Sequence, residues 1–107
     1  MSREFARVLG DGRLTNYRAA IYICPERTRT VIKVITLVNL TEQQITLNLN
    51  LNTSGTPRRI LSKDLWFKPH HLIETDVEYS LEPGDLIEGE AATGDAVEYT
   101  ISGIEHR

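Results

Sequence analysis

The segment ITLNLNLN, residues 45–52, alternates apolar and polar side chains at every position. A period of two over this length is typical of a β-strand that buries one face. The apolar positions therefore predict a row that faces the core, and the opposite face carries asparagines, including Asn48 and Asn50. Asparagine is unfavourable in strands, so this row is either an interaction surface or an ordinary solvated face.

The rest of the chain also consists of short apolar runs between turn signals, and no window shows helical apolar spacing between capping residues. EPGD at residues 82–85, for example, predicts a tight turn because proline presets φ and glycine accepts a positive φ. The pattern predicts an all-β protein, a single-domain two-sheet β-sandwich of jelly-roll type over residues 13–107. Residues 1–12 have a weaker pattern, end in a turn at GDGR, and are expected to form a flexible N-terminal arm.

The most hydrophobic segment is TVIKVITLVN, residues 30–39. Simple alternation places Ile32, Val34 and Val38 on one face, and Val31, Ile35 and Leu37 on the other. A strand that is apolar on both faces is expected to be covered on both sides. One face would pack in the core, and the face with Val31, Ile35 and Leu37 would offer a contact surface to a loop, an arm or another subunit.

Composition narrows the function classes. The 107 residues are 40% hydrophobic and 25% charged, which is ordinary for one globular domain. No apolar run is long enough to span a membrane, no apolar leader is present, and the net charge of −3 does not favour nucleic-acid binding. We therefore expect neither a membrane nor a nucleic-acid partner, and synthesis in a reducing cytoplasm with Cys24 as a free thiol.

The charge differs between the two halves of the chain. Residues 1–60 hold nine Lys and Arg against four Asp and Glu, whereas residues 61–107 hold three against eleven. Such asymmetry fits an acidic surface that docks on a basic neighbour, including a second copy of the chain. Alternatively, strands from the two halves interleave and the asymmetry disappears in the fold, which is the interpretation that we favour slightly.

The sequence offers little for catalysis or metal binding. His70 and His71 lie near carboxylates, but adjacent residues on a strand point to opposite faces and no ligand spacing is repeated. Cys24 has no histidine nearby in the sequence to act as a base and is expected to be a small buried residue. No glycine-rich phosphate loop or nucleophile turn is present. We predict a non-enzymatic protein with no cofactor and no metal.

Trp66 and Phe67 form the only adjacent aromatic pair that contains tryptophan. An exposed ring here would suit contact with a protein partner, or would form the platform that carbohydrate-binding β-sandwiches need. Alternatively, one ring of the pair lies in the core while the other caps it, which is the interpretation that we favour. If either ring is exposed, we favour contact with a protein over contact with a sugar.

Several segments together resemble small virion structural proteins of tailed bacteriophages. They are IYICPERTRTVIKVITLVNLT, RRILSKDL and the ending YSLEPGDLIEGEA with VEYTISGIE, so the resemblance covers residues 18–105, and FKPHHLIE departs from the pattern. The resemblance implies a small all-β subunit of the virion, a capsid decoration (cement) protein that bridges coat subunits. A neck or tail component is the alternative within the same class, and a carbohydrate- or receptor-binding module is the alternative from another class.

A decoration protein needs contact surfaces and no chemistry. Its partners would be the major capsid protein and further copies of itself, as a homotrimer. Asn48 and Asn50 could form a side-chain ladder about a three-fold axis, since asparagine both donates and accepts hydrogen bonds. The four arginines Arg27, Arg29, Arg58 and Arg59 are candidates for docking on acidic loops of the coat protein. The other candidate protein-contact residues are Val31, Ile35, Leu37, Trp66 and Phe67.

Overall fold

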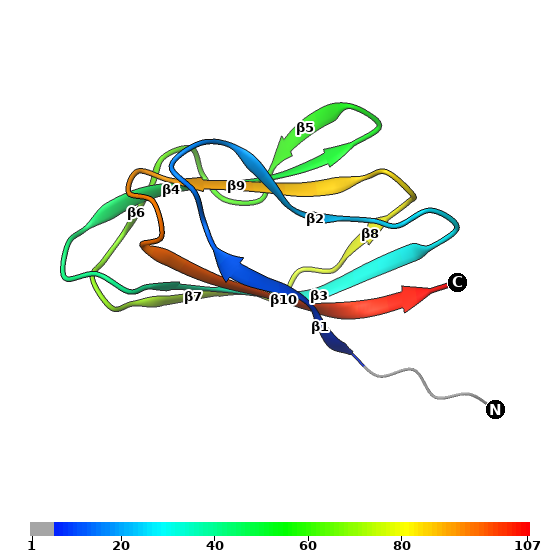
Figure 1. The fold of residues 1–107 in the computed structure, drawn as a ribbon, viewed down its shortest axis with the longest axis horizontal. Coiled ribbons are helices and arrows are strands. Elements are labelled where there is room, and N and C mark those ends of the chain that lie inside the picture. Colours follow the sequence, from blue (N-terminus) through cyan, green and yellow to red (C-terminus); the bar gives the residue numbers. More distant parts are fainter. Residues whose placement is uncertain (1–5) are drawn as a thin grey trace.

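Ten strands in two antiparallel sheets make up residues 6–107, which are the residues that the computed structural model describes (Figure 1). The strands are β1 (Arg7–Arg13), β2 (Ala19–Ile23), β3 (Arg29–Asn39), β4 (Ile45–Thr53), β5 (Thr56–Arg59), β6 (Leu65–Phe67), β7 (Leu72–Thr75), β8 (Tyr79–Leu81), β9 (Leu86–Ala91) and β10 (Val97–His106). The described part of the chain contains no helix, so the all-β, sandwich-like prediction is confirmed.

The strand pairing is nested from the two ends of the chain inwards. Sheet 1 has the order β1-β10-β3-β7, with β8 also paired to β3, and sheet 2 has the order β2-β9-β4-β5, with β6 also paired to β4. The first strand thus pairs with the last strand, and the second strand pairs with the one before the last. Each sheet therefore combines strands from both halves of the sequence, as the two layers of Figure 1 show.

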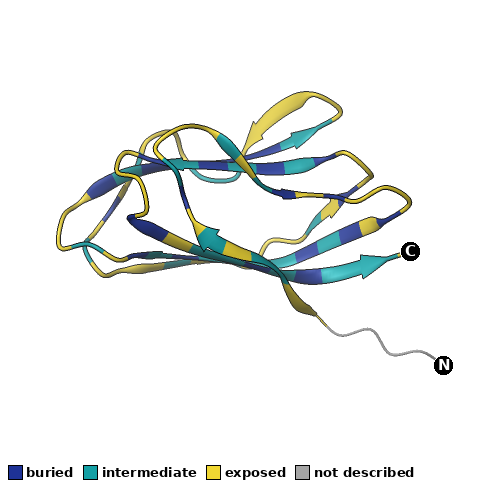
Figure 2. Ribbon diagram, in the orientation of Figure 1, coloured by how far each residue is buried: buried dark blue, intermediate teal, exposed yellow. Residues whose placement is uncertain are grey.

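The alternation in β4 is confirmed by the structure. Ile45, Leu47, Leu49 and Leu51 are buried, and they join one core cluster with apolar side chains of both sheets, such as Ile32 and Ile101. Figure 2 shows the buried positions on the strands of both layers, whereas β5 is exposed along its length. The core thus lies between the two sheets.

Strand β3 changes its phase at Lys33. Val34 pairs with Ser102 and Ile32 pairs with Gly103, which leaves Lys33 as an extra residue. Such a bulge moves every later side chain to the other face.

The bulge corrects the predicted contact surface. Ile35 and Leu37 are completely buried in the core, so they cannot contact a partner from the folded monomer. Val31, on the other side of the bulge, stays half-buried on the outer face, together with Val34 and Val38. Simple alternation failed here because both faces of β3 are apolar.

The predicted N-terminal arm is wrong for residues 7–12. They belong to β1, which pairs with β10 and continues through the expected GDGR turn to Arg13. A register shift between Val8 and Gly10 breaks the alternation in this strand and explains its weak sequence pattern. Residues 1–5, the remainder of the expected arm, lie outside the described residues.

Strands from the two halves of the chain interleave in both sheets, as the favoured interpretation predicted, and ion pairs form between the halves. The four ion pairs in residues 6–107 each join a basic residue of the first half to a glutamate of the second half. They are Arg7–Glu105, Arg18–Glu88, Arg29–Glu82 and Lys33–Glu78. The nested pairing of the strands brings these partners together.

The described residues include no helix of the length and apolar character that crossing a membrane requires.

Candidate functional site

Two turns lie side by side at one end of the molecule. The first turn joins β2 to β3 and contains Arg27, which has a positive φ of 57°. The second turn joins β8 to β9 and contains the predicted EPGD segment, in which the Asp85 amide donates to the Glu82 carbonyl at 3.0 Å. Backbone hydrogen bonds of 3.0 and 2.8 Å connect Cys24 of the first turn to Gly84 and Asp85 of the second.

The carboxylate of Asp85 fixes this end of the molecule. Its two oxygens accept hydrogen bonds from the backbone amides of Glu82 at 3.0 Å and Ser54 at 3.1 Å. The buried Asp85 side chain thereby holds both its own turn and the tip of the β4–β5 hairpin. Hydrogen bonds from backbone amides to a carboxylate are stronger than neutral ones, so this support is rigid.

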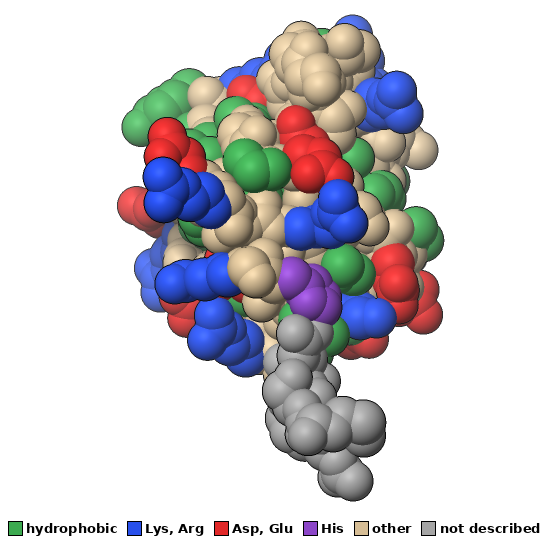
Figure 3. Space-filling view, turned by 90° about the vertical axis from the view of Figure 1, so that its right-hand side faces the viewer, with side chains coloured by type: hydrophobic (Ala, Val, Ile, Leu, Met, Phe, Trp, Pro, Cys, Tyr) green, Lys and Arg blue, Asp and Glu red, His purple; other side chains and the backbone are tan. Residues whose placement is uncertain are grey.

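The two turns enclose a pair of adjoining surface depressions of about 500 and 530 Å³ that share Arg27 and Thr28. We call the side chains of Arg27, Arg29, His106 and Arg107 the basic end; each of them lines one or both depressions. Figure 3 shows basic side chains spread over this face of the molecule, with acidic ones between them. The sequence prediction found Arg27 and Arg29 but missed His106 and Arg107.

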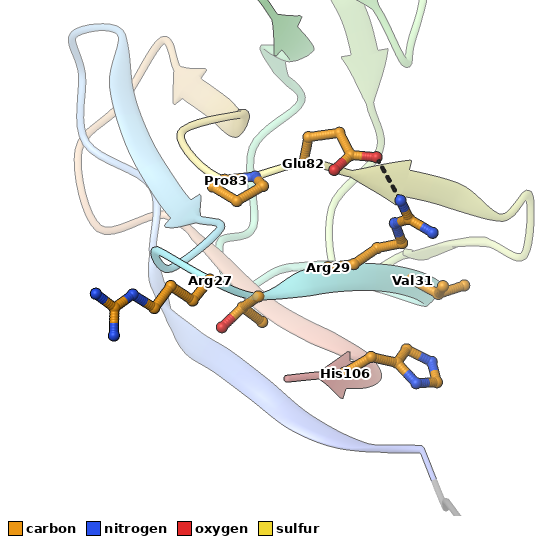
Figure 4. Close-up of a pocket in the computed structure, with 7 residues that line it drawn as sticks. Arg27, Arg29, Val31, Glu82, Pro83 and His106 are labelled. Carbon is orange, nitrogen blue, oxygen red and sulfur yellow. Dashed lines mark ion pairs between the residues drawn. The ribbon is translucent and has the colours of Figure 1, made fainter.

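The cations of the basic end differ in how far they are neutralised. Arg29 pairs with Glu82 at 3.2 Å, and both side chains are more than 60% exposed, so water screens this pair. Arg27 extends away from that pair in Figure 4, and neither Arg27 nor Arg107 has a carboxylate within ion-pair distance among residues 6–107. The basic end therefore presents cations that suit an acidic partner.

A buried network of polar side chains lies between the two sheets next to the basic end. The Tyr22 hydroxyl donates to the carboxylate of Glu105 at 2.7 Å and lies 2.8 Å from the Thr30 hydroxyl. The same carboxylate accepts from Arg7 at 2.9 Å, and the thiol of Cys24 lies 3.3 Å from the Thr30 hydroxyl. Tyr22 belongs to sheet 2, whereas Thr30 and Glu105 belong to sheet 1, so the network ties the sheets together.

The network shifts two ionisation equilibria. The hydrogen bond from Tyr22 is the main reason that the pKa of Glu105 lies below its ordinary value, and Arg7 adds to this effect. Burial is the main reason that the pKa of Tyr22 lies far above its ordinary value, and Glu105 adds to it. At neutral pH the Glu105 carboxylate is therefore charged and the Tyr22 phenol is protonated, and the role of the pair is to hold the two sheets together.

The outer face of sheet 1 carries an apolar strip that begins at the basic end. We call Val31, Val34, Val38 and Ile104 the outer strip; all four are half-buried and point away from the core. Val31 lies opposite Ile104 in the sheet and also lines the larger basic depression, so strip and basic end are continuous. An antiparallel sheet usually has polar residues on its solvated face, and these β-branched residues are an exception.

The asparagine row of β4 is partly used within the chain. The Asn48 side-chain oxygen accepts from Arg59 at 2.8 Å and from the Asp64 amide at 2.9 Å, and its nitrogen donates to the Asp64 carboxylate at 3.0 Å. Asn50 is 8% exposed between its neighbours Arg59 and Glu88. An asparagine ladder between subunits stays a prediction.

The remaining predicted residues are divided between core and surface. Phe67 is 1% exposed and belongs to the core, so it cannot contact a partner from the folded monomer, whereas Trp66 is 64% exposed on the outer face of sheet 2. Arg58 and Arg59 lie on the exposed strand β5. The structure thus brings Arg27, Arg29 and Val31 together, and it places Asn48, Arg59 and Trp66 on a different face.

In the described part of the chain, no three His, Cys, Asp or Glu side chains lie close enough together to hold a metal ion. The sequence matches no protein-family model and no curated protein.

Proposed function

We propose that the protein is a non-enzymatic structural subunit of a tailed-phage virion, a capsid decoration protein that binds the major capsid protein. The observation that carries this proposal is the continuity between the outer strip and the basic end. An apolar strip flanked by Arg27 and Arg107, which form no ion pair within residues 6–107, provides the two parts of a protein interface, a desolvated centre and a charged rim. The complementary surface on a coat subunit would be an apolar ridge next to an acidic loop.

The energetics support contact through the outer strip. Burial of apolar surface contributes about 25 cal/mol for each Å² removed from water, and valine and isoleucine side chains in a sheet lose little conformational freedom on binding because they are already restricted. The cations of the basic end would add orientation and a faster association rate. Such binding should weaken with added salt, because exposed charges are screened over about 10 Å at 0.1 M ionic strength.

The proposed topology is a jelly roll. The pairs β1·β10, β2·β9, β3·β8 and β4·β6 are what a long antiparallel hairpin gives when the chain folds back on itself. Wrapping that hairpin into two layers adds the pairs β10·β3 and β9·β4. In this interpretation β7 and β5 extend the interrupted strands next to β3 and β4, and the nested pairing is the support for it.

The proposal is tested first by quantitative mass spectrometry of purified virions from the source. A copy number close to that of the coat protein is expected for a decoration protein. A number that suits only one ring or fibre would move the protein to the neck or tail, and absence from the virion would overturn the proposal.

A binding assay with undecorated capsids then tests the surface itself. The variants Val31→Glu/Val34→Glu and Arg27→Glu/Arg107→Glu should each lower binding by tenfold or more. The control Lys63→Glu/Lys68→Glu reverses two exposed charges outside the basic end and should bind normally. Equal binding of all variants would show that the outer strip and the basic end are not the docking surface.

Self-association into a trimer is a separate part of the proposal. Sedimentation of the purified protein at micromolar concentration is expected to give a trimer, and a monomer throughout would restrict the partners to the coat protein.

A further inference from the structure

Trp66 is a large apolar side chain in polar surroundings on the outer face of sheet 2. Its side chain is 64% exposed, and its cross-strand neighbour on β4 is Thr46. Side chains that lie opposite each other in a sheet are in contact range, so the indole lies within reach of Thr46, which lines a shallow depression. This depression of about 170 Å³ is also lined by Asn16, Asn48, Asp64, Glu90, Ala91 and Ala92.

The polar groups of this depression are held in place by the fold. Asp64 has a positive φ of 50°, which is uncommon for a residue other than glycine. Hydrogen bonds of 2.9 and 3.0 Å to Asn48 hold it there, and Arg59 fixes Asn48 in turn at 2.8 Å. An uncommon backbone conformation that its surroundings enforce is a frequent feature of binding sites.

Several acceptors and donors of the depression have no partner within the described chain. No hydrogen bond or ion pair within residues 6–107 engages the carboxylate of Glu90, the amide of Asn16 or the hydroxyl of Thr46. Asp64 uses one side-chain oxygen for Asn48, and its other oxygen is unengaged within the same residues. These groups line the depression and are available to a ligand.

A second exposed aromatic residue is a chain neighbour of the residues that line the depression. Tyr17 follows Asn16 in the chain and is 62% exposed. The segment that holds it is joined to β9 by the hydrogen bond from the Ala91 amide to the Thr15 carbonyl at 3.0 Å. From β6 across β4 and β9 to this segment is three strand spacings, or about 14 Å, which is the length of a short oligosaccharide.

We propose that this aromatic–polar patch, formed by Trp66, Thr46, Asn48, Asp64, Glu90, Asn16 and Tyr17, binds a neutral oligosaccharide of pyranose units. The C–H face of a pyranose ring is apolar and packs on an indole, while its hydroxyl pairs donate to carboxylates and accept from amides. The two carboxylates disfavour an acidic sugar by charge repulsion. Pyranoses with equatorial hydroxyl groups fit best, because both of their faces are apolar and the patch is shallow.

A protein partner fits the surroundings of Trp66 less well. The centre of a protein interface is depleted of charged residues, whereas two carboxylates and two side-chain amides line the depression within reach of which the indole lies. Burial of those groups under a protein would need a matching donor for each of them. Sugar hydroxyls supply such donors at short spacing, and the proposal holds whether or not the protein belongs to a virion.

The single tryptophan provides a direct measurement, since its fluorescence reports only this patch. Titration with cellohexaose is expected to shift the Trp66 emission and to saturate below about 10 mM, with maltohexaose binding more weakly. In calorimetry, Trp66→Ala should show no measurable binding of cellohexaose, and Asp64→Asn or Glu90→Gln should bind it about tenfold more weakly. Tyr17→Ala should weaken the binding of cellohexaose more than the binding of cellobiose.

The control variant is Leu72→Ala, which removes another exposed large apolar side chain, from sheet 1, and should bind cellohexaose normally. Circular dichroism spectra that match the wild type show that each variant is folded. Absence of binding to both hexasaccharides at about 10 mM would overturn the proposal. Protection of Trp66 from soluble quenchers in the presence of coat protein, without a response to sugar, would assign the patch to a protein interface instead.

Discussion

At the scale of the single residue, Tyr22 is the side chain on which the basic end depends most. Its hydroxyl crosses from sheet 2 to two strands of sheet 1 and bonds Thr30 and Glu105. A tyrosine with only one such bond could lose it and turn towards water, but this hydroxyl is part of a buried network. A polar group in such a network that loses its hydrogen bond lowers the free energy of unfolding.

We therefore expect Tyr22→Phe to lower the free energy of unfolding by about 1–3 kcal/mol at neutral pH. The variant keeps the ring and removes only the hydroxyl, so chemical denaturation followed by circular dichroism measures the value of the network. Tyr17→Phe is the matched control, since the Tyr17 side chain is 62% exposed, and its stability should stay unchanged. A loss in both variants, or in neither, would contradict this role of the Tyr22 hydroxyl.

The same variant should change how stability depends on pH. The pKa of Glu105 is lowered from 4.5, chiefly by Tyr22, so its carboxylate stabilises the fold above pH 4.5, and this contribution is lost as the pH falls through the lower folded-state value. In Tyr22→Phe the pKa of Glu105 rises towards 4.5, and the acid-induced loss becomes smaller. Unfolding free energies of both proteins between neutral pH and about pH 3 measure the difference, and parallel curves would contradict it.

At the scale of the element, the bulge at Lys33 decides which side chains β3 offers to the outside. The bulge also explains why the neighbouring strand β10 has a glycine at position 103. A Cβ at that position would collide with the carbonyl oxygen of Val31, which comes close to β10 at the irregularity. The bulge in one strand and the glycine in the other therefore belong together.

The bulge predicts that substitutions at two adjacent residues of β3 change the stability by very different amounts. Ile35→Ala should destabilise the protein by about 2–5 kcal/mol because it leaves a cavity in the core. Val34→Ala should change the free energy of unfolding by less than about 1 kcal/mol, because the side chain points outwards. Denaturation of the two variants measures both values. Similar effects would mean that β3 alternates without a break.

The elements differ in how well the sequence predicted them. In β4 one face is apolar and the other polar, so the pattern alone gave the correct buried face. In β3 both faces are apolar, and alternation carries no information on where the phase changes. In β1 the bulge breaks a short pattern, and the strand is recognisable only through its pairing with β10. Sequence predicts an element poorly when another strand determines its conformation.

At the scale of the whole molecule, the candidate docking surface is made by the arrangement of distant segments. Arg27, Arg29 and Val31 are close in the sequence, and the sequence singled them out. His106 and Ile104 join them only because β10 pairs with β3, from Arg29 opposite His106 to Val31 opposite Ile104. The aromatic–polar patch likewise combines β6, β4, β9 and the segment before β2. Long-range pairing of this kind cannot be read from local pattern.

The nested pairing of the strands also sets the order in which the chain can fold. The innermost pair, β4·β5, closes a turn of only a few residues. The pairing of Arg7 in β1 with Gly103 in β10, in contrast, closes a loop that contains most of the chain. Closure entropy rises with loop length, and β topologies with distant contacts fold in milliseconds to seconds. In refolding followed by pulsed hydrogen exchange, we expect the amides of β4 and β9 to be protected before those of β1. The edge of β10 is thus the last to be covered, and during that interval a second chain can pair with it, so refolding yield should fall as protein concentration rises.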